Sequence, residues 1–148
     1  MSKKPIILGI ESSCDETAAS IVTENEHGLP IVLSNIVSSQ VEVHKKFGGV
    51  VPELAARAHI EKIDWIVQQA IEESGIKIEE IDAVASTAGP GLIVCLSVGL
   101  SFGKSFSSVM NIPFISALRI PKCYTRFCWI PMQKVVIFLA KRAFATSI

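Results

Sequence analysis

A short polar segment between two apolar runs holds most of the residues that could do chemistry. Residues 11–17 (ESSCDET) place three carboxylates, hydroxyls and a thiol in one turn. Carboxylates at a strand end can hold Mg²⁺ or act as a general base, and hydroxyls and turn N–H groups can hold phosphate oxygens. This composition favours a loop that faces a nucleotide. A structural alternative remains, because Ser13 and Glu16 have capping-box spacing and Asp and Ser are common in turns.

A second candidate lies at residues 87–91 (TAGPG), which follow an apolar run and precede a helical pattern. Backbone N–H groups at such a helix start can bind an anion, although many purely structural turns have the same composition. Residues 99–105 (GLSFGKS) nearly match a phosphate-binding P-loop, but they are one residue short between the glycines and lie inside the predicted helix. We therefore interpret Lys104 as a surface or phosphate-facing helix residue.

Histidines and cysteines do not form a recognisable metal set. His27, His44 and His59 lack metal-ligand spacing, so a structural role is favoured for all three. Cys123 and Cys128 have four residues between them, which is wider than the usual zinc spacing, and no histidine follows them. With no targeting signal toward an oxidising compartment, the four cysteines are expected to be reduced thiols.

Apolar periodicity predicts the elements that must position these residues. Runs rich in Ile and Val predict strands, and apolar residues at three- and four-residue steps predict amphipathic helices. Pro52 suits a first helical turn and Gly75 suits a C-cap. The predicted strands are 5–10, 18–22, 30–37, 81–85 and 113–117, and the predicted helices are 52–75 and 92–109.

This order of three strands, helix, strand, helix and strand predicts an α/β fold with an antiparallel meander at one edge. It is the order of a ribonuclease-H-like lobe, as used by actin-like ATPases. With 49% hydrophobic residues, the chain has enough apolar material for one core of ordinary domain size.

The distribution of charge divides the chain. All 14 acidic residues lie at or before Asp82, whereas residues 119–148 carry six basic residues and no acidic one. A basic segment can contact nucleic acid or a membrane surface, and a change of reading frame would also produce this break. The run from Val135 to Ala140 is far shorter than the roughly 20 residues that span a bilayer. We expect a cytoplasmic protein without a membrane span.

Three segments together carry a resemblance to a known family. Residues 9–17 (GIESSCDET), residues 48–55 (GGVVPELA) with Arg57 and His59, and residues 87–92 (TAGPGL) occur in the family's order. The chain resembles the TsaD-like family of tRNA N6-adenosine threonylcarbamoyltransferases, formerly called O-sialoglycoprotein endopeptidases. The resemblance covers about four fifths of the chain and the first third of a typical family member.

The resemblance implies a two-lobed actin-like fold that transfers a threonylcarbamoyl group from its adenylate to N6 of the adenosine next to the anticodon in tRNA. It implies tRNA and a dimerising paralogue as partners, and a metal, often iron, between the lobes. Carried over to this sequence, Ser13, Cys14, Gly89 and Gly91 would bind the nucleotide-like substrate. Asp15 and Glu16 would act as catalytic carboxylates, one orienting the adenosine amine or accepting its proton.

The sequence departs from the family after the predicted strand 113–117. The family continues into two histidines at i and i+4 that bind the metal, whereas here Leu118 to Cys123 follow and no histidine occurs after His59. We therefore expect a lobe over residues 1–117, a divergent basic tail over 118–148, and no cofactor in this fragment.

The sequence allows three interpretations of the function of this chain. The favoured one is a truncated or frame-shifted transferase, inactive alone, whose exposed apolar surface promotes self-association. The alternative is a non-catalytic module that pairs with a paralogue or tRNA. A metalloprotease is disfavoured because the chain has no HExxH helix.

Overall fold

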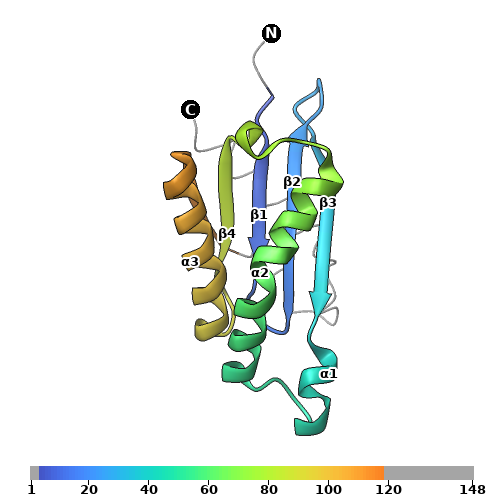
Figure 1. The fold of residues 1–148 in the computed structure, drawn as a ribbon, viewed down its shortest axis with the longest axis vertical. Helices are drawn as coiled ribbons and strands as arrows, with labels where there is room; N and C mark the ends of the chain where they lie inside the picture. The colour runs from blue at the N-terminus through green and yellow to red at the C-terminus, as the bar shows by residue number, and fades with distance from the viewer. Residues whose placement is uncertain (1–3, 119–148) are drawn as a thin grey trace.

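The computed structural model describes residues 4–118, and within them the chain forms one five-stranded sheet with its helices on one face (Figure 1). The strands are β1 (Ile7–Glu11), β2 (Glu16–Glu24), β3 (Pro30–Ser39), β4 (Ala83–Gly89) and β5 (Phe114–Leu118). The helices are α1 (Val41–His44), α2 (Pro52–Ser74) and α3 (Ile93–Met110), with short 3₁₀ turns at Lys45–Phe47 and Ile78–Glu80.

The strand order is β3-β2-β1-β4-β5. The strand pairs β1–β2 and β2–β3 are antiparallel, whereas β1–β4 and β4–β5 are parallel. Each parallel connection passes through a long helix, as crossover geometry requires. The predicted meander at one edge and the ribonuclease-H-like element order are both confirmed. The parallel pairing also brings the carboxyl ends of β1 and β4 to the same edge of the sheet.

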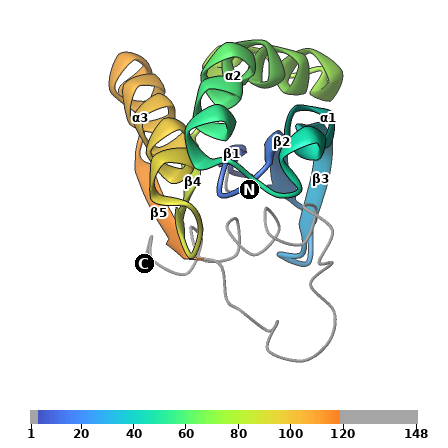
Figure 2. The same cartoon turned by 90° about the horizontal axis from the view of Figure 1, so that it is seen from below.

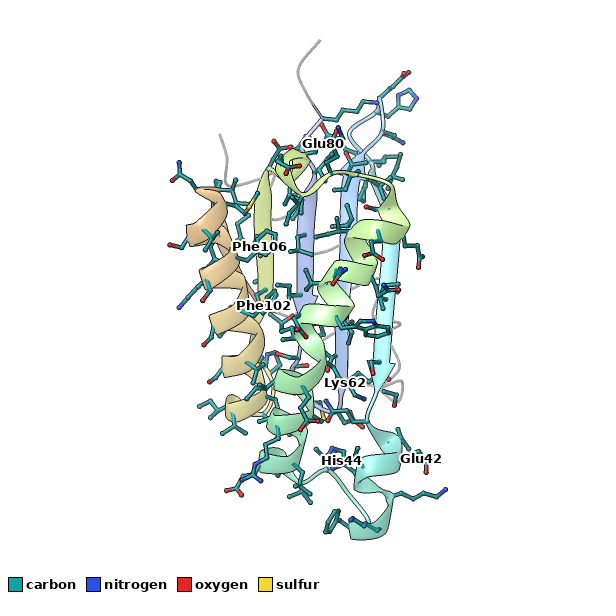
Figure 3. The ribbon with its side chains drawn as sticks, in the orientation of Figure 1. Glu42, His44, Lys62, Glu80, Phe102 and Phe106 are labelled. Atoms are coloured by element: carbon teal, nitrogen blue, oxygen red, sulfur yellow. The ribbon has the colours of Figure 1, made fainter. Side chains whose placement is uncertain are left out.

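The main core lies between the sheet and the helices α2 and α3 (Figure 2). Because side chains alternate along a strand, Leu8, Ile21 and Val84 face the helices while their neighbours Ile7, Val22 and Ala85 form a second cluster on the other face. Figure 3 shows Phe102 and Phe106 on the inner side of α3, where they pack against the main core.

Helix α2 begins and ends as its sequence predicts. Pro52 occupies its first turn, and Gly75 follows its last residue with a φ of +72°, donating its N–H to the carbonyl of Glu72. Of the helices within residues 4–118, α3 has the length and apolar composition that could cross a membrane. In this fold, however, α3 packs on the sheet through its two glycines: a Cβ on Gly103 would approach Phe114 and Val84, and one on Gly99 would approach Ser12.

Several predicted boundaries were wrong. Glu16 and Thr17 belong to β2 and not to the preceding turn, because their pairing with Ser39 and Ser38 extends the ladder past the apolar run. Strand β4 likewise continues to Gly89, because its last residues pair with β5. The short helix α1 and both 3₁₀ turns were not predicted, since elements this short have no usable periodicity. Residues 119–148, including Cys123 and Cys128, lie outside the described residues.

Candidate functional site

Residues 12–15, here called the site turn, follow the carboxyl end of β1. The last residue of that strand, Glu11, fixes the turn through its side chain. The Glu11 side chain is fully buried, and its carboxylate accepts hydrogen bonds from the Ser13 N–H (2.6 Å) and the Thr87 hydroxyl (2.6 Å). Burying a carboxylate is costly unless donors compensate it, and these two donors do so. Glu11 therefore ties the site turn to the neighbouring strand β4.

Ser12 fixes the turn to α3 by inserting its hydroxyl into that helix. The hydroxyl donates to the carbonyl of Cys95 (2.8 Å) and accepts from the N–H of Gly99 (3.1 Å). Cys95 and Gly99 are four residues apart, so Ser12 bridges two groups that would otherwise bond only to each other along the helix. Gly99 is required here because a Cβ would lie 2.5 Å from the Ser12 hydroxyl oxygen.

The segment between β4 and α3 packs directly on the site turn, backbone against backbone. Leu92 donates its N–H to the carbonyl of Ser13 (2.8 Å), and a Cβ on Gly91 would lie 2.6 Å from that same oxygen. Gly89 is buried at the end of β4 with a φ of +151°, and a cis peptide bond joins it to Pro90. The two segments singled out in the sequence, residues 11–17 and 87–91, are therefore in contact.

This packing leaves fewer free backbone N–H groups at the start of α3 than the predicted anion site would need. Helix α3 begins at Ile93, and the N–H of Leu92, which precedes it, is already bonded to Ser13. Lys104 does not face this site. Its ammonium lies 5.9 Å from the ring centroid of Phe114, at the opposite end of β5 from the site turn.

The three carboxylates of the ESSCDET segment do not share one environment. Glu11 is fully buried, whereas Asp15 and Glu16 are half-buried. Burial raises the pKa of Cys14 and Cys95, and the charge of Asp15 adds to both shifts, so Asp15 lies within electrostatic range of these thiols. Glu16 immediately precedes Thr17, whose side chain meets His59 on the helical face of the sheet. Alternation along β2 therefore directs Glu16 to the other face of the sheet.

Cys14 is exposed, but its environment makes it a poor nucleophile. The residue as a whole is exposed, but partial burial of its thiol raises the thiol pKa to about 11, and a hydrogen bond to Asp15 and the charge of that residue add to the effect. With this pKa the thiol is almost entirely protonated at neutral pH. Because only the thiolate is strongly nucleophilic, its reactivity is low. Burial also raises the pKa of Cys95. Covalent catalysis by either thiol is therefore disfavoured, and Cys14 is better suited to contact a ligand.

Glu11 and Thr87 were part of the candidate segments but had no role of their own, and Gln40 and His59 were not placed in the site. Glu11 and Thr87 lie within the two candidate segments, and their common position at neighbouring strand ends was an available signal. Gln40 and His59 gave no such signal, because their contacts with the turn depend on how α2 packs on β2. Within residues 4–118, no three His, Cys, Asp or Glu side chains gather closely enough to hold a metal ion.

Comparison with known proteins places this geometry in context. The family model described as "TsaD: tRNA N6-adenosine threonylcarbamoyltransferase" matches residues 31–117. A tRNA N6-adenosine threonylcarbamoyltransferase from Pelagibacter ubique is 72% identical over 116 residues, which cover 78% of this chain and 32% of the relative. The protein of that name from Caldicellulosiruptor saccharolyticus is 52% identical over 130 residues, covering 87% of this chain and 38% of the relative. The chain thus spans about a third of the length of these curated relatives.

Solved structures support the fold. YeaZ from Pseudomonas aeruginosa superposes with a TM-score of 0.58 at 13% identity, covering 97% of this chain and 49% of YeaZ. RuvC from T. thermophilus, in complex with a Holliday junction substrate, superposes with a TM-score of 0.50 at 12% identity, covering 97% of this chain and 81% of RuvC. At such identities the likeness concerns the fold alone, which is ribonuclease-H-like.

Proposed function

This chain belongs to the TsaD family of tRNA N6-adenosine threonylcarbamoyltransferases, and from that premise we propose that residues 1–117 are the lobe that binds the adenylate side of the reaction. The observation that supports this most directly is the packing of Gly91 on Ser13, which joins two family segments at the carboxyl ends of β1 and β4. Ligands of open α/β sheets bind at that edge.

In the proposed site, Ser13, Cys14, Gly89 and Gly91 contact the threonylcarbamoyl-adenylate. Cys14 and Gly91 are exposed and can touch the ligand directly, whereas Ser13 and Gly89 are buried and would shape the site through their backbone. A thiol that stays protonated is compatible with this role because it does not compete as a nucleophile for the activated acyl group.

The proposed reaction needs a proton acceptor. The N6 amine of the tRNA adenosine attacks the carbamoyl carbon, the bond from that carbon to the adenylate phosphate breaks, and AMP leaves. The amine loses one proton, and Asp15, half-buried in the site turn, is the carboxylate we assign to accept it. Glu16 points to the other face of the sheet, so we assign it no contact with this amine.

The family's metal does not fit the described part of this chain. His44 and His59, the candidates nearest the site turn, are both engaged in hydrogen bonds to other groups. Since residues 4–118 bring no metal-binding group together, we derive no step through a metal.

We further propose that residues 118–148 are a tail that diverges in sequence from the family, and that the lobe of residues 1–117 is inactive by itself. The change of charge balance after Asp82 and the end of the family match at residue 117 support this. Exposed apolar side chains on α3, such as Ile93 and Val109, would favour self-association or pairing with a paralogue. The proposed compartment is the cytoplasm, where tRNA is available.

Titration with a non-hydrolysable analogue of threonylcarbamoyl-adenylate, followed by NMR of the backbone amides, tests the site. We expect the largest shifts at residues 13–16 and 89–91, and no loss of analogue binding for Asp15→Ala, because Asp15 is assigned to the tRNA amine and not to the adenylate. Glu26→Gln, in the exposed turn at the opposite end of β2, is the matched control and should bind normally. Shifts confined to other regions would refute the assignment.

A further inference from the structure

A row of hydrogen bonds joins the start of α2 to the site turn through three buried side chains. The Val51 N–H lies 3.4 Å from Nδ1 of His44, and Nε2 of His44 lies 3.4 Å from Oε1 of Gln40. Nε2 of Gln40 lies 3.0 Å from Nδ1 of His59, and Nε2 of His59 lies 3.1 Å from the carbonyl oxygen of Cys14. The exposed fractions of His44, Gln40 and His59 are 4%, 1% and 0%, so water does not substitute for these partners.

The two backbone groups at the ends fix the direction of every bond in this row. The carbonyl of Cys14 can only accept, so Nε2 of His59 must carry a proton. A neutral imidazole then has a bare Nδ1, which requires Gln40 to present its amide N–H₂ there and its oxygen to His44. Nε2 of His44 must therefore also be protonated, leaving its Nδ1 to accept from Val51, whose N–H can only donate. Both ends require the same arrangement.

Two further contacts connect this row to the residues of the site. The hydroxyl of Thr17 lies 2.6 Å from Nδ1 of His59 and can donate to it. The backbone N–H of Gln40 donates to the carbonyl of Asp15 (2.9 Å). His59 thus holds the carbonyl oxygen that precedes Asp15, and Gln40 holds the carbonyl oxygen of Asp15 itself, so the backbone is fixed on both sides of the candidate proton acceptor. Figure 3 shows where the row starts, with His44 between α1 and the first turn of α2.

We propose that His59 and His44 are positioning residues whose neutral Nε2–H tautomers, relayed through Gln40, hold the site turn in its binding conformation. The benefit to substrate binding rests on the proposed function, whereas the network itself can be tested without substrate or activity. The positioning role also explains why His44 and His59, which have no metal-ligand spacing, lie buried among polar side chains.

A proton added to His59 would disrupt the row. A protonated Nδ1 would face the Gln40 N–H₂ group, and flipping that amide would set a donor against Nε2 of His44. Burial lowers the pKa of His59, and His44 acts in the same direction, while the carbonyl of Cys14 and the charges of Glu11 and Asp15 oppose the shift. A lowered pKa means that the unfolded chain binds this proton more readily, so the stability contributed by neutral His59 is present above about pH 6.5 and is lost as the pH falls below it.

The first test is long-range ¹H–¹⁵N NMR of the imidazoles in the 148-residue chain at pH 7.5. We expect both His44 and His59 to be neutral with the proton on Nε2. A proton on Nδ1 of either residue would overturn the proposal, because it would face another donor. On acidification, the amides of Cys14 and Asp15 should shift together with the titration of His59.

The second test uses Cys14 as a reporter of the turn. Release of the turn returns the thiol pKa from about 11 toward its ordinary value, so His59→Phe should raise the alkylation rate of Cys14 at pH 8 by about tenfold. His59→Gln keeps a donor close to the position of Nε2 and should stay within about twofold of the parent rate, as should the control His27→Gln. Mass spectrometry of the peptide that contains Cys14 separates it from the other thiols.

Alkylation of His59→Phe at the parent rate would show that the turn holds itself, and would refute the positioning role. Equal acceleration in His59→Gln and His59→Phe would show that only the shape of the imidazole matters, and would also refute it. Because neither test includes the adenylate or tRNA, a failure of the proposed function would leave both results unchanged.

Discussion

The two turns at the ends of β2 are held in different ways. The β2–β3 turn is held by its own residues: Oδ1 of Asn25 accepts from the N–H groups of His27 (2.8 Å) and Leu29 (2.9 Å). In the site turn, Ser12 and Cys14 bond to groups on α3 and α2, which are 83 and 45 positions away in the sequence. A turn held by its own residues only reverses the chain. The site turn is held by α2, by α3 and, through Glu11, by β4, so it presents a fixed surface, as a binding site requires.

Gly91→Ala should break the site turn most severely. The new Cβ would lie 2.6 Å from the carbonyl oxygen of Ser13 and 2.7 Å from its Cβ, so backbone on one side must move. We expect a loss of about 3 kcal/mol in the free energy of unfolding, measured by urea denaturation. Gly49→Ala is the matched control, because nothing lies within 4 Å of its added Cβ. A loss equal to that of the control would mean that the two segments do not pack as described.

Thr87→Val removes one of the two hydrogen bonds to the buried carboxylate of Glu11 while preserving side-chain shape. A hydrogen bond to a charged group contributes about 2 kcal/mol, and that is the destabilisation we expect. Thr23→Val, near the other end of β2, removes a hydroxyl that donates to the carbonyl of Pro5 (3.0 Å), and should cost about 1 kcal/mol or less. If thermal or urea unfolding showed Thr23→Val to be more destabilising than Thr87→Val, the conclusion that the site turn is held more strongly than the other end of β2 would be contradicted.

Asn25→Ala should have the smallest effect, because both of its side-chain bonds are exposed to water and local to the turn. We expect a loss of about 0.5 kcal/mol, and no change in the alkylation rate of Cys14. A change at Cys14 would show that the two turns are coupled through β2, and the contrast between them would then have to be abandoned.

The elements of this fold were largely predictable from the sequence. The apolar steps along residues 54–71 predicted α2, and Pro52 and Gly75 predicted its ends, because these signals act within one or two helical turns. The errors occurred where pairing between strands decided the boundary. Glu16 and Thr17 are polar enough to resemble a turn, but the ladder with β3 makes them part of a strand.

For the candidate site, the sequence determined which segments carry the reactive groups, since residues 11–17 and 87–91 are distinctive in composition and match a family pattern. It did not determine how their side chains are used. That Glu11 is buried beneath the turn, that Ser12 enters the helix at Gly99 and that His59 holds Cys14 all depend on groups 45 to 87 positions away. Local composition sets the chemistry available at each position, whereas sheet register and helix packing decide which groups become partners.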